Sequence, residues 1–107
     1  MSHTDATHKG SLHLEQSLVD LAVKLIQPTK IVLFGSRARG DHRPTSVYDF
    51  AFFFHGKPTP ERWAEFCLEA EETLPTLAAL DLVPYSEAHA PLKASIDREG
   101  LVIYEAK

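Results

Sequence analysis

The sequence predicts an α/β fold of the α+β kind, with one mixed β-sheet of about four strands flanked by helices. Short apolar runs typical of buried strands alternate with segments whose apolar residues recur at helical spacing. Glycines and prolines separate these segments. A length of 107 residues, 44% hydrophobic and 24% charged, suits one layered core. We therefore expect a single folded domain over residues 11–107, preceded by a flexible polar tail at residues 1–10.

The first two elements are a helix over residues 11–27 and a strand over residues 30–35. Leu14, Leu18 and Leu25 follow helical spacing, and Pro28 ends the pattern. The strand "KIVLFG" is an almost continuous apolar run that ends in glycine, which is typical of a strand buried on both faces.

A second strand, "VYDFAFFFH" at residues 47–55, follows a loop around Gly40 and Pro44. Because side chains alternate along a strand, Val47 and Asp49 should share one face, while the aromatic residues at the even positions share the other. Asp49 is the one acidic residue in this apolar run.

The C-terminal half predicts a helix, a strand, a short helix and a last strand. Thr59 is the expected N-cap of the first helix, which extends to residue 74. The third strand lies within residues 77–86 and contains Asp81. A short helix from Pro91 ends before Gly100, and "LVIYE" at residues 101–105 closes the sheet.

Composition argues against several classes of protein. A formal net charge of −4 and a pI near 5.8 give no overall attraction to nucleic acid or to anionic membranes, so neither is an expected partner. No apolar run has the length of a membrane span and the N-terminus lacks a secretory pattern, so we expect a cytoplasmic protein. His3, His8 and His13 fall on different faces of a helix and are not expected to bind a metal.

Four residues point to chemistry. The missing side chain of Gly35 would let a phosphate approach the backbone, and the Ser36 hydroxyl could bind its oxygens. Asp49 and Asp81 interrupt apolar strands, where a buried carboxylate needs an ion pair, hydrogen bonds or a metal. Magnesium would satisfy both, but so would a structural network with Arg37 or Arg39, and the residues alone do not separate these alternatives.

The order of these residues resembles a known signature. "GSRARGDHRPTSVYDFAFF", residues 35–53, is similar to that of the minimal nucleotidyltransferases of the DNA polymerase beta superfamily: Gly-Ser, Ala-Arg-Gly, a spacer, and Ser-Asp-x-Asp-Leu. The matching positions are Gly35, Ser36, Arg37, Ala38, Arg39, Gly40, Ser46 and Asp49. Asp81 stands where the family keeps its third carboxylate, and "EGLVIYE" resembles its closing strand. The resemblance spans residues 14–105 and implies a nucleotidyltransferase fold.

The resemblance also implies a site. Gly35, Ser36 and Arg39 would contact the nucleotide, with a structural role for Arg39 as the alternative. Asp49 and Asp81 would be catalytic residues that bind Mg²⁺, with ATP or another NTP as substrate. Short bacterial members resemble antitoxins that bind a HEPN-domain toxin and in some cases modify it with AMP. Such a HEPN protein is therefore the implied partner, in a homo- or hetero-oligomer.

Val47 departs from the signature, which has an aspartate at this position. In the family this aspartate helps to hold two Mg²⁺ ions. The resemblance therefore implies that a shared metal ligand is missing here, and we expect nucleotide binding to survive better than turnover. Asp41 is the nearest other acid, but it lies in the loop. Three functions stay open: a weakened nucleotidyltransferase, a catalytically degenerate antitoxin or regulatory binding module, and a nucleotide sensor.

Overall fold

Helices and strands alternate along the chain, as the apolar pattern predicts. The computed structural model describes the backbone of residues 2–107 and the side chains of residues 13–107. The helices are α1 (Ser2–Leu25), α2 (Ser36–Arg39), α3 (Pro60–Thr73) and α4 (Ala90–Glu99), with a short 3₁₀ helix η1 (Tyr85–Glu87). The strands are β1 (Lys30–Phe34), β2 (Tyr48–Phe53), β3 (Leu80–Pro84) and β4 (Leu101–Glu105).

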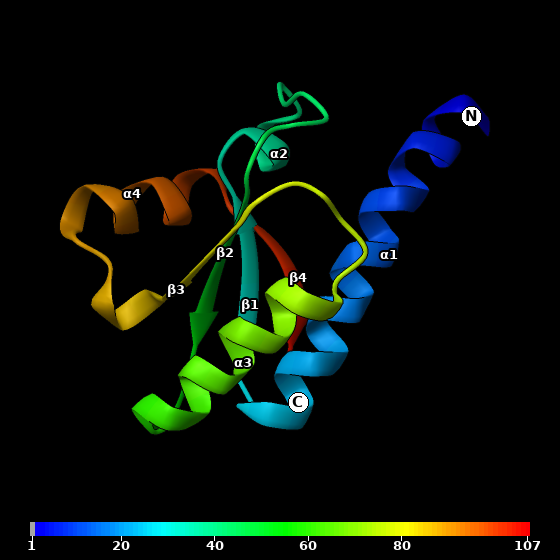
Figure 1. The fold of residues 1–107 in the computed structure, drawn as a ribbon. Coiled ribbons are helices and arrows are strands. Elements are labelled where there is room, and N and C mark those ends of the chain that lie inside the picture. The colour runs from blue at the N-terminus through cyan, green and yellow to red at the C-terminus, as the bar shows by residue number, and fades with distance from the viewer. Residues whose placement is uncertain (1) are drawn as a thin grey trace.

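The four strands form one mixed sheet in the order β3-β2-β1-β4. β1 pairs antiparallel with β2 and with β4, whereas β2 and β3 are parallel. α2 and the loop after it lie together at one end of this sheet (Figure 1). The predicted mixed sheet flanked by helices is confirmed.

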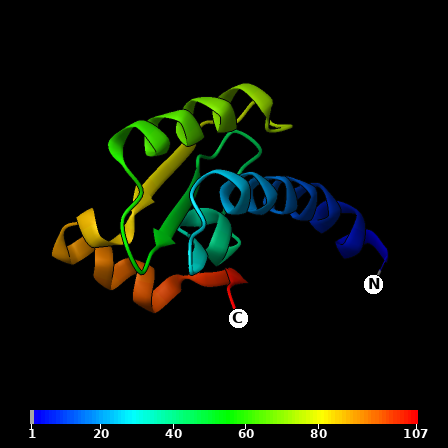
Figure 2. The same ribbon diagram turned by 90° about the horizontal axis from the view of Figure 1, so that it is seen from below.

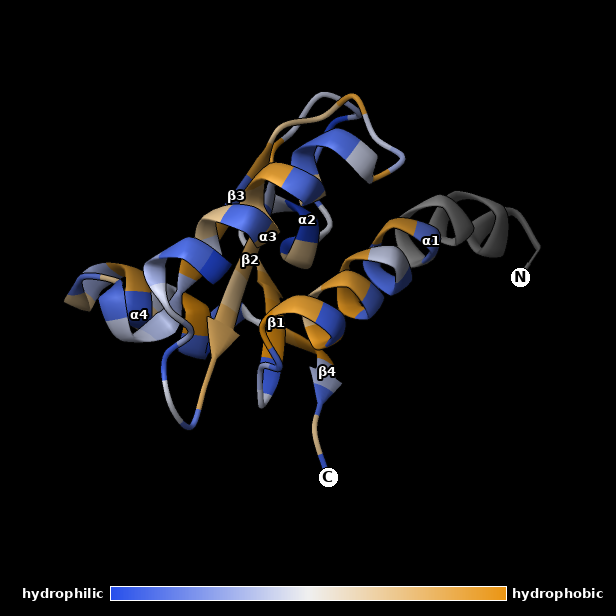
Figure 3. Cartoon of the chain, turned by 60° about the horizontal axis from the view of Figure 1, so that its bottom comes forward, coloured by the Kyte–Doolittle hydropathy of each residue, from blue (hydrophilic) through white to orange (hydrophobic). Residues whose placement is uncertain are grey.

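Helices cover both faces of the sheet. Figure 2 shows α3 on one side of the strands and α4 on the other. The larger core cluster joins side chains of α1 and α3 to β1 and β2, and a smaller cluster lies beneath α4 and η1. Hydrophobic residues run along most of β1 and β2 in Figure 3, as expected for strands covered on both faces.

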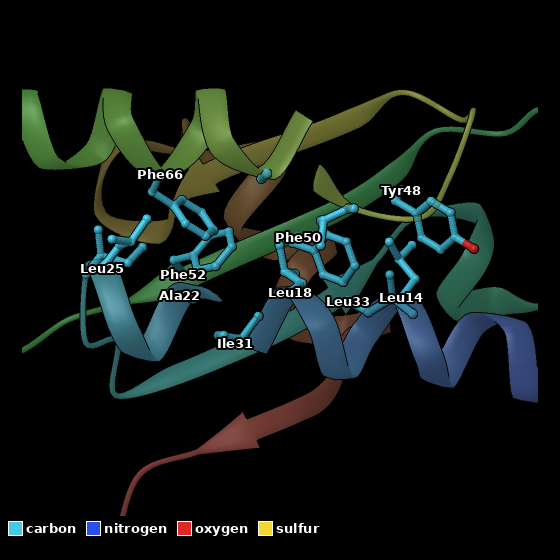
Figure 4. Close-up of a cluster of buried hydrophobic side chains, with 13 residues drawn as sticks. Leu14, Leu18, Ala22, Leu25, Ile31, Leu33, Tyr48, Phe50, Phe52 and Phe66 are labelled. Atoms are coloured by element: carbon cyan, nitrogen blue, oxygen red, sulfur yellow. The ribbon is translucent and has the colours of Figure 1, made fainter. Parts of the chain in front are cut away.

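Alternation along β2 divides its side chains between the two clusters. Tyr48, Phe50 and Phe52 are buried on the α1 and α3 face, where Figure 4 shows Phe52 beside Phe66 of α3. Ala51 and Phe53 belong to the cluster beneath α4. Asp49 has the same parity as these two residues and therefore lies on the α4 face. The prediction that the aromatic residues at the even positions share one face is confirmed.

α1 begins earlier than predicted. It starts at Ser2, whereas the sequence analysis placed the helix at residues 11–27 after a loose tail. That start is wrong because residues 2–10 contain no proline, and a single glycine costs only about 1 kcal/mol within a helix. The side chains of His3 and His8 lie outside the described residues, and the flexibility of residues 1–10 stays a prediction.

The later elements follow the prediction closely. The Thr59 side chain accepts a hydrogen bond from the Arg62 amide at 3.1 Å and caps α3, with Pro60 as its first residue. Pro84 ends β3 at the edge of the sheet, where a missing backbone donor is tolerated. Within the described part of the chain, no helix is both long enough and apolar enough to cross a membrane.

Candidate functional site

Gly35 makes the turn from β1 into α2. Its backbone has φ 78° and ψ −158°, in a region that L side chains rarely adopt. A Cβ atom at this position would overlap the Oδ2 atom of Asp49. Both the backbone angle and the contact therefore require glycine, and the absence of a side chain brings the end of β1 against the carboxylate of β2.

Ser36 begins α2, a single helical turn. The Ala38 amide donates to the Gly35 carbonyl at 3.1 Å, and the Gly40 amide donates to the Ser36 carbonyl at 2.9 Å. Gly40 closes the turn with φ 86° in the left-handed region. The amides of Ser36 and Arg37 come first in the helix and have no carbonyl partner within it, so these two amides and the Ser36 hydroxyl can bind an anion there.

The sheet places Asp49 beside Asp81. The two residues are register partners on the parallel strands β2 and β3, and Asp49 is also the partner of Phe34 on β1. Register partners on neighbouring strands present their side chains on the same face. Two carboxylates that are far apart in the sequence therefore meet next to Gly35.

The environment of Asp49 disfavours its charged form. Partial burial contributes most, followed by the negative charge of Asp81 and by the hydrogen bond that protonated Asp49 donates to Asp81; together they raise the pKa of Asp49 to about 6. The positive charge of Arg39 acts in the opposite direction. The pair thus carries negative charge that a proton or another cation would relieve.

The environment of Asp81 differs from the one that the sequence predicts. The sequence analysis treated both aspartates as buried in apolar strands, but Asp81 is exposed and Asp49 is only partly buried. β3 is an edge strand, so Asp81 has a neighbouring strand on one side only. The burial prediction is wrong for Asp81, although the prediction that the two carboxylates belong to one site agrees with their register.

Arg39 lies at the border of this site and is bound by two carboxylates. Its Nε donates to Asp41 Oδ2 at 3.2 Å, and its Nη1 donates to Glu99 Oε1 at 3.0 Å. The hydrogen bonds to Asp41 and Glu99 raise the pKa of the Arg39 guanidinium. The sequence analysis left open a structural network of Arg37 or Arg39 with Asp49 or Asp81. Among residues 13–107, neither arginine forms an ion pair with either aspartate.

Arg37 organises the loop before β2, a role the sequence analysis missed. Its guanidinium donates to the carbonyl oxygens of Arg43, Pro44 and Ser46 at 3.0–3.3 Å. It also lies over the Tyr48 ring, 3.7 Å from the centroid. The sequence showed an arginine and an aromatic residue, but their contact depends on the path of the loop.

Val47 lies just outside the strand. β2 begins at Tyr48, and the Val47 side chain is 40% exposed. The expected same-face placement of Val47 and Asp49 assumed that the strand begins at residue 47, so alternation alone does not place the valine in the site. Asp41, the nearest other acid, is held by Arg39.

A family model described as "Polymerase beta, Nucleotidyltransferase" matches residues 15–107 of this chain. The chain belongs to this family. Solved structures with the same fold include a toxin–antitoxin with AMP-PNP, 21% identical over 87% of this chain and 74% of that chain, with a TM-score of 0.73. A minimal nucleotidyltransferase is 24% identical over 81% and 86% of the two chains, with a TM-score of 0.62.

The toxin–antitoxin MntA-HepT is also similar to this nucleotidyltransferase family member. It is 18% identical over 87% of this chain and 71% of that chain, with a TM-score of 0.64. No curated protein matches the chain. At these identities the structures establish the nucleotidyltransferase fold alone.

The carboxylates of this family member fit a divalent cation. Asp49 and Asp81 supply oxygen ligands of the kind that Mg²⁺ prefers. Burial and the negative charge of Asp81 raise the pKa of Asp49, and a cation would offset the repulsion between the two carboxylates. Among residues 13–107 there is no group of three or more His, Cys, Asp or Glu residues suited to a metal. The donor set therefore fits one cation completed by nucleotide oxygens or water better than two cations.

Proposed function

We propose that this chain is a weakened nucleotidyltransferase that binds ATP with Mg²⁺ and transfers AMP to an acceptor on a HEPN-domain toxin. The observation that carries the proposal is the register of Asp49 and Asp81 beside the Gly35 turn. The family membership supports a nucleotidyl reaction, and the likeness to the toxin–antitoxin with AMP-PNP supports this nucleotide and a protein partner.

Each residue has a distinct part in the proposed reaction. Gly35 lets the Asp49 carboxylate lie against the turn, and Ser36 with the first amides of α2 binds the oxygens of the triphosphate. Asp49 and Asp81 hold Mg²⁺, which supplies charge neutralisation at the phosphates. An acceptor hydroxyl attacks the α-phosphorus, its proton passes to solvent, the bond to the β-phosphate oxygen breaks, and pyrophosphate leaves.

Label transfer tests this proposal. The chain is incubated with a HEPN-domain partner, Mg²⁺ and ATP labelled on the α-phosphate, and the partner should acquire label while pyrophosphate is released. ATP labelled on the γ-phosphate is the matched control and should leave the partner unlabelled. Asp49→Asn keeps the side-chain volume but removes the charge and should abolish transfer. Absence of transfer with both Mg²⁺ and Mn²⁺ would contradict an enzymatic function.

The composition of the site favours a second candidate function. With Val47 outside the strand and only two carboxylates in register, the chain could act as an antitoxin by occupying the partner's surface without chemistry. If this second function is correct, the chain should form a stable complex with the partner without ATP. The Asp49→Asn variant should still neutralise the partner. Loss of neutralisation in a folded Asp49→Asn variant would exclude it.

A further inference from the structure

The two carboxylates that bind Arg39 differ in how firmly they are held. Asp41 lies in the loop after α2 with a side chain 62% exposed, whereas the Glu99 side chain is 22% exposed. Glu99 ends α4, directly before Gly100, where an added Cβ would overlap Val32 of β1. This close approach anchors the end of α4 on the sheet, so Glu99 is the better fixed of the two partners.

The two partners also occupy different edges of the guanidinium. Glu99 accepts from Nη1, and Asp41 accepts from Nε. Nε and Nη2 together form the edge that binds two oxygens of a carboxylate or phosphate at once. Nη2 makes no hydrogen bond within residues 13–107. Asp41 therefore blocks this edge with a single bond, and Glu99 holds the group from the other side.

Arg39 lies one helical turn from the carboxylate site, because its backbone amide donates to the Gly35 carbonyl at 3.1 Å and Gly35 contacts Asp49. A cation there would attract the phosphates of a nucleotide bound at the Gly35 turn. Exposed ion pairs such as that with Asp41 contribute little, because water screens both charges. An anion with several charges can therefore displace Asp41 at little cost, whereas the pair with Glu99 can persist.

We propose that Glu99 is a positioning residue that holds Arg39 by Nη1 with its Nε and Nη2 edge toward the nucleotide phosphates, which displace Asp41 on binding. This inference rests on the proposed nucleotide-binding function. It assigns a role to Glu99, 60 residues away from Arg39 along the chain. A purely structural link between α2 and α4 is the alternative.

Three variants separate the two explanations. Glu99→Ala removes the acceptor and should weaken ATP binding with Mg²⁺ about 5- to 10-fold by calorimetry, less than the loss of a direct charged hydrogen bond, because Glu99 acts on the phosphates only through Arg39. Glu99→Gln keeps an oxygen acceptor and should stay within about 2-fold of the unchanged chain. Asp41→Asn removes the competing charge and should tighten binding. A structural link predicts no tightening with Asp41→Asn.

A second readout does not depend on the nucleotide. The side-chain Nη1–H signals of Arg39 in low-temperature NMR should be protected in the unchanged chain and in Glu99→Gln, and should broaden by exchange with water in Glu99→Ala, because Glu99 is the acceptor for Nη1. A protected signal in Glu99→Ala would overturn the positioning role, as would equal ATP affinity for both Glu99 variants. If the unchanged chain binds no ATP, the proposed function fails, and the NMR signal still decides whether Glu99 positions Arg39.

Discussion

Gly35 and Asp49 approach each other so closely that a methyl group on the glycine would overlap the carboxylate oxygen Oδ2. This contact joins the phosphate-binding turn at the end of β1 to the acidic pair on β2 and β3. It makes Gly35 the residue at which the fold and the candidate site are most directly coupled.

Replacing Gly35 should therefore damage both stability and binding. Gly35→Ala should lower the free energy of unfolding by about 1–3 kcal/mol, because alanine is strained at this φ and displaces Asp49. It should also weaken ATP binding with Mg²⁺, measured by calorimetry. Gly40→Ala is the matched control, since Gly40 also has positive φ but has open space around it. If both variants lose ATP affinity equally, the contact with Asp49 is not the cause.

An aspartate at position 47 tests how far Val47 limits nucleotidyl transfer. Val47→Asp should raise the rate of label transfer at least about 10-fold, because even the outer partners of metal ligands change activity by about 10–100-fold. Val47→Asn adds polarity without charge and should not raise the rate. An unchanged rate in Val47→Asp would mean that the loop before β2 holds residue 47 away from the phosphates.

Stability should depend on pH through Asp49. Its pKa is about 6 in the folded chain and near 3.8 when unperturbed, so the folded state binds more protons between these values. The destabilising effect of the charged carboxylate is therefore complete above about pH 6 and disappears as pH falls toward 4. Asp49→Asn should exceed the unchanged chain in melting temperature at pH 8, and this difference should vanish near pH 4. A difference in melting temperature that stays constant from pH 4 to pH 8 would contradict the raised pKa of Asp49.

Magnesium and protons should compete for the same carboxylates. Millimolar Mg²⁺ should raise the melting temperature at pH 8, where Asp49 is charged, and should do so much less at pH 5, where it is largely protonated. Asp49→Asn should reduce the effect at pH 8. Equal stabilisation of both proteins by Mg²⁺ at pH 8 would place the cation elsewhere.

Phe66 should be the main anchor of α3 on the sheet. Its ring is fully buried and lies edge-on to Phe52, with centroids 5.2 Å apart. Phe66→Ala should reduce the free energy of unfolding by about 3–5 kcal/mol, measured by urea denaturation. Leu68→Ala, on the exposed side of the same helix at 60% exposure, should change it by at most about 0.5 kcal/mol.

The sequence predicted most of the helices and strands, because caps and side-chain alternation depend on residues close together in the chain. Thr59 with Pro60 marks the start of α3, and alternation along β2 assigns Phe50 and Phe52 to the core. The start of α1 was missed, since a polar segment with helical backbone has no apolar pattern to reveal it. Asp81 was placed in a buried strand because the sequence does not tell an edge strand from a central one.

The sequence by itself determined the family, the turn at Gly35 and Ser36, and the loss of an acid at Val47, because each of these is a matter of residue type and short spacing. The tertiary structure decided which distant groups meet. The parallel pairing of β2 and β3 brings Asp81 to Asp49, and the packing of α4 brings Glu99 to Arg39. These contacts depend on strand order and helix packing, which arise from the burial of the whole core.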